Sequence, residues 1–515
     1  MTALAEFHDR MGAINDVLNA VSVLQWDQRT MMPPGGAATR GKQVATLVGV
    51  ACDMLLADET RRLTDAADRA TAAEPEDSPA RRAIAQTRDA IAFHARIPGS
   101  LQTRRAEVKA VANAAWIRAR TESDFAIFAP YLQEVVALTR AYADAIGYES
   151  HPYDAMLSIY EPGQTVAGLE TLFDGLRGGI APLLAAVRAA PEPRADFLAR
   201  SFPKDGQADI ALALARKIGF DTARGRLDET VHPFEVSFTR EDVRIATRFH
   251  RDFLNASLFG TLHEAGHGIY EQGVDPAYTR TPLATDLIGW YAVGGVSFGM
   301  HESQSRLYEN HIGRSRAFWR INFDALRAAF PGNFDDVDAE AFYRAVNLVR
   351  PGFIRVEADE LTYDMHVMLR VEIESALLDG SLEVAGLPTA WNEAMLRDLG
   401  LAVPDDRRGV LQDIHWSNCM VGSFCTYTIG NVVAAQLMDA MRRTRPDIQA
   451  SLDAGDYAPL KAHLNATIHR HGRRFTRDEL LLQATGRRLD PTAYLAYLRA
   501  KVADVYGIGG TEAPA

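Results

Sequence analysis

The stretch Leu262-His263-Glu264-Ala265-Gly266-His267-Gly268 contains the pattern H-E-x-x-H, in which two imidazoles and one carboxylate have the spacing of a catalytic metal site. If the stretch is helical, His263 and His267 lie one turn apart on one face and can reach a single ion. Glu264 is turned away from that line and can take a proton from a metal-bound water, the general-base role of metalloproteases. The sequence therefore predicts a metal-binding helix, with a chance match to the pattern as the alternative.

Residues on both sides of the motif favour a helix, because apolar side chains recur at helical spacing before it and Gly273 supplies a stop after it. The apolar positions are Phe253, Leu254, Leu258, Phe259 and Leu262. The glycines at 260, 266 and 268 oppose a helix by about 1 kcal/mol each relative to alanine. Close packing near the metal would have to compensate for them.

A catalytic zinc site also needs a third protein ligand and an open position for water. Glu271 lies eight residues after His263, about 12 Å along a helix axis, which is too far for both to bind one ion. The third ligand should therefore come from another element. The next carboxylates are Asp286, Glu302 and Glu309, and Glu302 lies in HESQSRLYEN (301–310), which we expect to form a second helix crossing the first.

The pairing of HEAGHGIYEQG (263–273) with HESQSRLYEN resembles the carboxypeptidase Taq family of zinc metallocarboxypeptidases. Further segments are similar to that family's signatures and follow the same order: WDQRTMMPP at 26–34, HPF at 232–234, IRVEADE at 354–360 and GVLQDIHW at 409–416. The resemblance implies that Glu302 is the third metal ligand. It also implies a homodimer, short peptide substrates and a broad residue preference.

An enzyme that acts at a carboxyl terminus must recognise a free carboxylate, for which arginine is the natural partner. Arg355 and Arg244 are the candidates. The structural alternative for Arg355 is an ion pair with Glu357, Asp359 or Glu360, and for Arg244 an ion pair with Asp242. Further candidates for binding the peptide are His232, Gln412, His415 and Tyr427.

The acidic cluster Glu357, Asp359 and Glu360 suggests a second layer around the metal, because a zinc-bound histidine commonly donates its other N–H to a carboxylate. Which of the three does so is left open. Trp26 and Asp27 are expected to serve core packing and a structural hydrogen bond, without a catalytic role.

The sequence departs from the family pattern in three places. The connection from Leu283 to His301 is longer than expected, and its uncharged run 287–300 could form a lid, a groove wall or a dimer contact. Ala246 stands where the family has threonine. Ser423 and Cys425 replace a tyrosine and a proline, and loss of an oxyanion donor there would cost about 10²-fold in rate unless Tyr427 or His415 substitutes.

Composition is that of a soluble intracellular protein, with 47% hydrophobic and 24% charged residues. The amino terminus has no signal-peptide pattern, and the three cysteines have no metal-like spacing, which together predict a cytoplasmic location with free thiols. A net charge of -12 disfavours nucleic acid as a partner. The uncharged run 287–300 is shorter than the roughly 20 residues that cross a bilayer, so no membrane association is expected.

Helical periodicity dominates the chain and is clearest at 83–95, 132–146, 166–189 and 432–443. The best strand candidate is 231–239. Residues 73–79 are expected to form a surface loop and 509–515 a flexible tail. We therefore predict a mainly α, large helical zincin-like fold: a single domain, 1–508, whose two lobes flank a deep substrate groove, with a small β-sheet near the metal helix.

The predicted function is that of a metallocarboxypeptidase, which releases single residues from the carboxyl end of peptides. His263, His267 and Glu302 would hold one zinc ion, although cobalt or manganese could occupy such a site, and Glu264 would activate the water. Two alternatives stay open. An oligopeptidase would use the same metal to cut internal bonds, and a catalytically weakened relative would only bind peptides.

Overall fold

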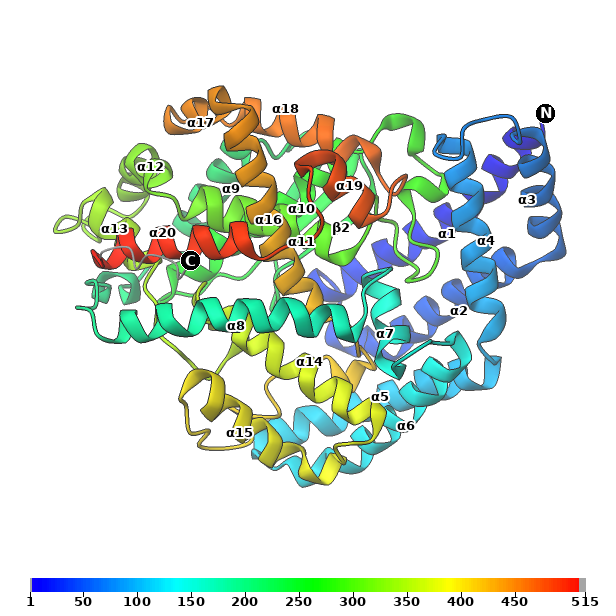
Figure 1. The fold of residues 1–515 in the computed structure, drawn as a ribbon, viewed down its shortest axis with the longest axis horizontal. Coiled ribbons are helices and arrows are strands. Elements are labelled where there is room, and N and C mark those ends of the chain that lie inside the picture. The colour runs from blue at the N-terminus through cyan, green and yellow to red at the C-terminus, as the bar shows by residue number, and fades with distance from the viewer. Residues whose placement is uncertain (1, 509–515) are drawn as a thin grey trace. The chain divides into compact units, whose positions relative to one another are not determined.

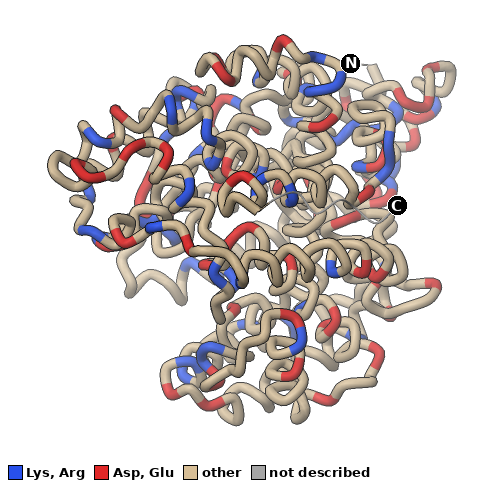
Figure 2. Tube along the Cα trace, turned by 60° about the vertical axis from the view of Figure 1, so that its left-hand side comes forward, with Lys and Arg blue, Asp and Glu red and all other residues tan. Residues whose placement is uncertain are grey.

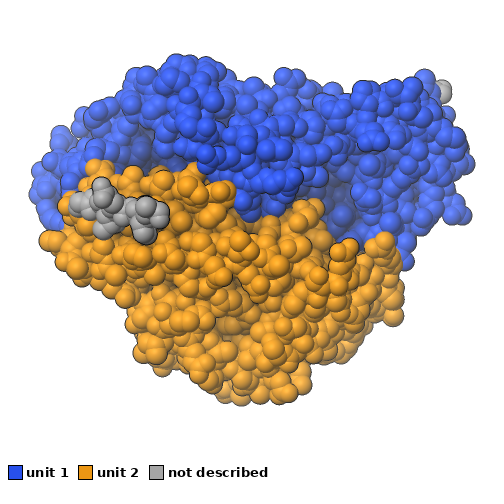
Figure 3. Space-filling model, viewed as in Figure 1, with its two compact units in different colours: residues 1–95, 194–346, 433–489 blue, residues 96–193, 347–432, 490–515 orange. Residues whose placement is uncertain are grey.

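The computed structural model describes residues 2–508 (Figure 1). They form two compact units, each built from three separate stretches of chain (Figure 3). The first unit comprises residues 1–95, 194–346 and 433–489, and the second comprises residues 96–193, 347–432 and 490–515. The predicted tail 509–515 lies outside the described residues. Whether residues 1–508 act as one domain around a substrate groove stays a prediction.

Helices make up most of the first unit. They are α1 (Ala3–Thr30), α2 (Ala37–Leu56), α3 (Asp58–Ala70), α4 (Pro79–Arg96), α9 (Lys204–Ile218), α10 (Leu254–Gly273), α11 (Phe298–Arg306), α12 (Arg316–Ala329), α13 (Ala339–Val346), α17 (Pro446–Asp453), α18 (Ala458–Thr467) and α19 (Arg477–Thr485). A π-helical turn, Leu307–Gly313, follows α11 directly.

The second unit is built from α5 (Gly99–Glu122), α6 (Ala129–Ile146), α7 (Pro152–Tyr160), α8 (Val166–Arg188), α14 (Tyr363–Asp379), α15 (Leu387–Leu399) and α20 (Thr492–Tyr506). Helix α16 (Cys425–Thr444) begins in the second unit and ends in the first. All four predicted helices are confirmed, as α4, α6, α8 and α16. The predicted loop 73–79 is confirmed except that Pro79 already begins α4.

The single sheet among the described residues has three strands, β1 (Gly225–Glu229), β2 (Phe234–Thr239) and β3 (Asp242–Thr247), in the order β1-β3-β2. Strand β3 is parallel to β1 and antiparallel to β2. The predicted strand 231–239 is therefore confirmed only from Phe234, because the proline of the HPF segment precedes the hydrogen-bonded ladder. The predicted fold class, mainly α with a small sheet, is confirmed.

The core of the first unit near the amino terminus is apolar, with Phe7, Ile14, Leu18 and Leu55 fully buried. Trp26 packs as predicted, since it is only 9% exposed. Asp27 has the structural role expected of it, because its carboxylate pairs with Arg40 at 2.8 Å and joins α1 to α2.

The uncharged run 287–300 is tied to the first unit at several points. Leu287 belongs to its apolar core, and the Trp290 ring stacks on His94 with centroids 4.3 Å apart. The backbone N–H groups of Gly294 and Gly295 donate to Glu271 at 2.8 and 3.0 Å. This segment is thus anchored by side-chain packing and by backbone hydrogen bonds.

Charged residues of both signs are mixed along the chain in the view of Figure 2. Within residues 2–508, no helix combines the length and the apolar character that crossing a membrane requires.

Helices α10 and α11 lie in close contact at Gly266. A Cβ at this position would lie 2.5 Å from the carbonyl oxygen of Gln304 and 2.7 Å from Cα of Ser305. Both atoms belong to the backbone and cannot turn aside. This close contact explains why a residue that weakens helices stands inside the H-E-x-x-H motif.

Gly266→Ala should therefore lower the free energy of unfolding by about 1–3 kcal/mol through overpacking, despite the better helix propensity of alanine. The thermal unfolding midpoint of the apoprotein measures the effect. Gly41→Ala in α2 is the matched control, because nothing lies within 4 Å of its Cβ position, and it should be neutral or stabilising. Equal stability of the two variants would show that the helices separate without cost.

Candidate metal centre

Helix α10 presents the two histidines of the motif on one face. The rings of His263 and His267 have centroids 4.9 Å apart and are nearly perpendicular, with an interplanar angle of 83°. Most residues from Leu254 to Gln272 are buried, so the helix is held on nearly all sides rather than along one stripe. The predicted helix and its end at Gly273 are confirmed.

Glu302 of α11 lies opposite the two rings. Its Oε2 is 3.7 Å from Nε2 of His263 and 3.5 Å from Nε2 of His267. Three donors that bind one zinc ion tetrahedrally, each at about 2.1 Å, are separated from one another by about 3.4 Å. The three donor atoms lie within 4.8 Å of one another, and no other group of three potential ligands meets this limit within residues 2–508. The residues present therefore fit a divalent ion with three protein ligands.

The protonation states of two of the three ligands, His267 and Glu302, also suit a metal ion. Burial, together with nearby His301, lowers the pKa of His267 to about 3, so its imidazole is neutral. Burial alone would raise the pKa of Glu302, but His263 and Arg306 hold it well below its usual range. A neutral imidazole and an ionised carboxylate are the forms that bind metal ions.

The environment of Glu264 suits proton transfer rather than metal binding. Its side chain is buried, with 6% of the residue exposed, and burial followed by the charges of Glu302 and Glu309 raises its pKa to about 7. A divalent cation at the three donors would favour the ionised form. A carboxylate that changes protonation near neutral pH is suited to accept and return a proton.

The predicted second layer around the metal is corrected by the structure. Nδ1 of His263 donates to Oε2 of Glu309 at 2.9 Å. Glu309 follows Glu302 by seven residues, a helical spacing that places both side chains toward α10 and that could have identified it from the sequence. The other carboxylates have different partners: Asp359 accepts from Thr362 and Glu360 pairs with Lys501.

His301 and Glu271 form a second support, which the sequence did not reveal. The His301 ring stacks on His267 with centroids 4.4 Å apart and an interplanar angle of 15°. Its Nε2 donates to Oε1 of Glu271 at 2.9 Å. As expected, Glu271 is not part of the ligand group; it orients a ring that packs against a ligand.

Arg244 lies on β3 and takes part in the ion pair considered as its structural alternative, with NH2 2.8 Å from Oδ2 of Asp242. Its guanidinium also lies over the rings of Trp26 and Phe238, at 4.5 and 4.6 Å. His232 is exposed in the loop before β2. Ala246 is fully buried on β3, so the methyl group there packs inside the sheet region.

Four predicted peptide-binding residues of the second unit form one cluster. The backbone N–H of Arg355 donates to Oε1 of Gln412 at 2.9 Å. The Arg355 guanidinium lies over the ring of Tyr427 at 4.9 Å, and His415 contacts the Tyr427 hydroxyl at 3.4 Å.

The structural alternative considered for Arg355, an ion pair with Glu357, Asp359 or Glu360, is wrong. The actual partner is Asp413, whose Oδ1 lies 2.9 Å from NH2 of Arg355. Asp413 also binds Arg370, which is fully buried, at 2.5 Å. One carboxylate thus joins two guanidinium groups from different segments.

The two substituted positions in the segment 421–427 are both buried. Ser423 is 4% exposed and Cys425 is fully buried, with its Sγ 3.6 Å from the carbonyl oxygen of Gly422. Tyr427 is partly exposed. Of these three residues, Tyr427 is therefore the one with the most accessible side chain.

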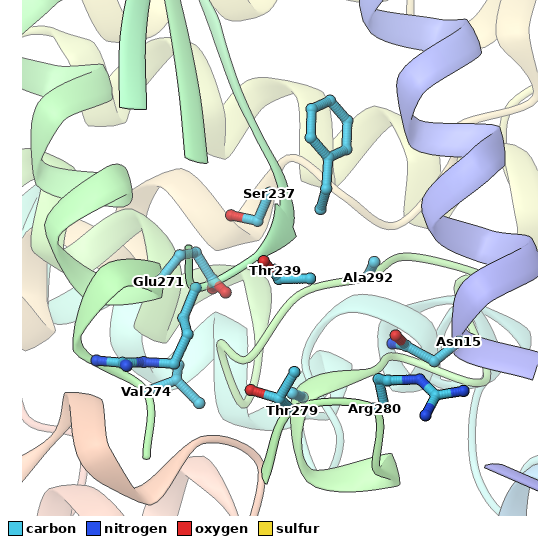
Figure 4. Close-up of a pocket in the computed structure, with 11 residues that line it drawn as sticks. Asn15, Ser237, Thr239, Glu271, Val274, Thr279, Arg280 and Ala292 are labelled. Atoms are coloured by element: carbon cyan, nitrogen blue, oxygen red, sulfur yellow. The ribbon is translucent and has the colours of Figure 1, made fainter. Parts of the chain in front are cut away.

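A small cavity in the first unit lies beside Glu271 (Figure 4). Its volume is about 20 Å³, and its lining includes Asn15, Ser237, Thr239 and Val274. Such a space holds about one water molecule. It is too small for a peptide and is therefore not the substrate site.

Comparisons with known proteins agree over nearly the whole chain. A sequence model described as carboxypeptidase Taq (M32) metallopeptidase matches residues 6–502. Carboxypeptidase 1 of Bacillus subtilis is 36% identical over 97% of this chain and 98% of its own, and thermostable carboxypeptidase 1 of Thermus thermophilus is 37% identical over 94% of each. The M32 carboxypeptidase crystal structure from Deinococcus radiodurans R1 superposes with a TM-score of 0.92 at 38% identity, covering 98% of this chain and 100% of that one.

Glu309→Ala should weaken metal binding about 10- to 100-fold, because Nδ1 of His263 loses the carboxylate that orients the ring. The dissociation constant for zinc, measured by competition with a chelator, tests this. Glu357→Ala is the matched control, since Glu357 is an exposed carboxylate of the rejected cluster. A larger loss of affinity in the Glu357 variant would reverse the assignment.

Asp413→Asn should lower the free energy of unfolding at pH 7 by about 3–5 kcal/mol, because two buried guanidinium groups lose their shared partner. Although burial alone would raise it, Arg370 and Arg355 hold the pKa of Asp413 well below its usual range. The stabilisation is therefore present above the unfolded-state pKa of about 3.9 and is lost as the pH falls below it.

The difference in thermal midpoint between wild type and Asp413→Asn should consequently narrow in acid. Asp405→Asn, which breaks the more exposed pair with Arg408, serves as the control and should cost about 1 kcal/mol or less. A gap that stays constant between pH 7 and pH 3 would contradict the role of the Asp413 charge.

Proposed function

Because this chain belongs to the carboxypeptidase Taq (M32) family of metallopeptidases, we propose that it removes single residues from the carboxyl end of peptides. The observation that carries the proposal is the approach of Glu302 Oε2 to the Nε2 atoms of His263 and His267, beside a buried Glu264. His263, His267 and Glu302 would hold one zinc ion. Two imidazoles and one carboxylate are a common ligand set of catalytic zinc, although cobalt or manganese can compete for it.

The chemistry divides between the ion and the residues around it. When bound, a divalent ion there polarises the scissile carbonyl and lowers the pKa of a water. Glu264 accepts the proton of the attacking water and returns it to the leaving amine. Glu309 and His301 keep the two imidazoles in orientation.

Recognition of the peptide end is assigned to arginine. Arg355 and Arg244 are the proposed partners of the free carboxylate, since a guanidinium can donate two parallel hydrogen bonds to it. Gln412, His415, Tyr427 and His232 are proposed to contact the rest of the peptide. The contacts of Arg355 with Asp413 and Tyr363 support a side chain held in one orientation before substrate arrives.

We further propose a cytoplasmic location, which the three free cysteines of the described chain support because a reducing compartment keeps thiols free. A homodimer is proposed on the family resemblance alone. Light scattering on the purified protein tests the oligomeric state.

A defined peptide mixture, incubated with the protein and analysed by mass spectrometry, tests the activity. Stepwise loss of carboxyl-terminal residues, abolished by a chelator and restored by zinc or cobalt, is the expected result. Peptides with an amidated carboxyl terminus should resist. Cleavage of the amidated peptides at internal bonds would identify an oligopeptidase instead, and intact peptides under every condition would indicate a binding protein.

Glu264→Gln should retain the metal and lose at least about 10²-fold in turnover, because the amide cannot accept the proton of the water. Metal content by atomic emission and kcat on one peptide are measured together. Glu241→Gln, which changes an exposed carboxylate, is the control and should keep wild-type turnover. Full activity in the Glu264 variant would refute its role as the base.

A further inference from the structure

The two oxygens of the Glu302 carboxylate face different neighbours. Oε2 is the atom that faces Nε2 of His263 and of His267, at 3.7 and 3.5 Å. Oε1 accepts a hydrogen bond from Nε of Arg306 at 2.7 Å. Glu302 and Arg306 are four residues apart on α11, a spacing at which side chains meet on a helix surface.

Arg306 also contacts the second carboxylate of the centre. Its NH1 lies 3.3 Å from Oε2 of Glu309, and that oxygen accepts from Nδ1 of His263 at 2.9 Å. The side chains of Glu302, Arg306 and Glu309 are only 9%, 12% and 13% exposed. The Arg306 guanidinium therefore connects Glu302, a candidate metal ligand, to Glu309, the carboxylate that orients the candidate ligand His263. These contacts are largely shielded from solvent.

We propose that Arg306 is a positioning residue that restricts Glu302 to binding the metal ion through one oxygen. This inference rests on the metal centre of the proposed function. Carboxylates bind cations through either one or both oxygens. The charged hydrogen bond from Arg306 to Oε1 competes with binding of the ion through both oxygens. The Arg306 guanidinium is itself held in place by its contact with Glu309.

The restriction matters for the chemistry assigned to the centre. A catalytic site of this kind needs a coordination position that no protein atom fills. If Glu302 used both oxygens, the protein would supply four donor atoms instead of three. Arg306 thus keeps room for water and for the scissile carbonyl without touching either.

The guanidinium of Arg306 suits this task because its donors diverge in one plane, so Nε can bind Glu302 while NH1 faces Glu309. Arg314 provides a natural comparison. Its NH2 lies 3.3 Å from Oε1 of Glu309, and its guanidinium packs over Phe259 at 3.9 Å. Like Arg306, Arg314 brings a positive charge to Glu309. Unlike Arg306, it is not paired with Glu302.

A crystal structure of the unaltered protein loaded with zinc decides the geometry. We expect one oxygen of Glu302 at about 2.0–2.2 Å from zinc, with the other still on Nε of Arg306. Two oxygens at bonding distance would overturn the inference while leaving the proposed metal centre intact. Zinc absent from His263, His267 and Glu302 would overturn the metal centre itself, and the inference with it.

Cobalt-substituted protein offers a second test that is independent of turnover, because the visible absorption of Co²⁺ weakens as its coordination number rises. In Arg306→Gln, the visible absorption per bound cobalt should be weaker than in wild type, because Glu302 can then bind the ion through both oxygens. Arg306→Lys keeps a positive charge near the same oxygen but lacks the planar fork that also reaches Glu309, so it should lose less absorption than Arg306→Gln. Arg314→Gln should not differ from wild type.

An unchanged spectrum in Arg306→Gln would overturn the inference, as would an equal loss in Arg314→Gln or in Arg306→Lys. If Arg306→Gln fails to fold, the zinc-loaded wild-type structure still decides the question, because it needs no substitution.

Discussion

The contact between α10 and α11 at Gly266 is the constraint on which the candidate metal centre depends. Backbone atoms of Gln304 and Ser305 stand where a side chain at residue 266 would be. Only this closeness lets Oε2 of Glu302 reach within 3.7 Å of both imidazoles. The helix accepts a residue of low helical propensity because burial on nearly all sides, rather than propensity, stabilises it.

Features with a local pattern could be predicted from the sequence. The spacing of His263 and His267 and the stop at Gly273 identified α10, and the axial rise of a helix excluded Glu271 as a ligand. Apolar periodicity identified four more helices, because a helix face repeats every few residues. Glu302 was different: helical rise showed only that a partner from another element was needed, and family resemblance supplied the residue.

Partners that meet through tertiary structure could not be predicted. Glu309 and His263 are 46 residues apart, and Arg355 and Asp413 are 58 apart. In both cases the clustered carboxylates at 357–360 were the candidates that the sequence suggested. That suggestion failed because charge density along a chain says nothing about which elements pack together. The π-helical turn after α11 was missed for the same reason, since its hydrogen bonding is set by packing rather than by propensity.

The interleaving of the two units along the chain bears on biosynthesis. The candidate metal ligands lie in the middle segment of the first unit, yet His469, in its last segment, hydrogen-bonds to Gln304 and packs against Tyr270. A ribosome must therefore release almost the whole polypeptide before the surroundings of the ligands are complete. Folding of the segment that carries the candidate ligands is thus not sufficient to complete their surroundings, and the order of synthesis makes this centre one of the last parts of the molecule to mature.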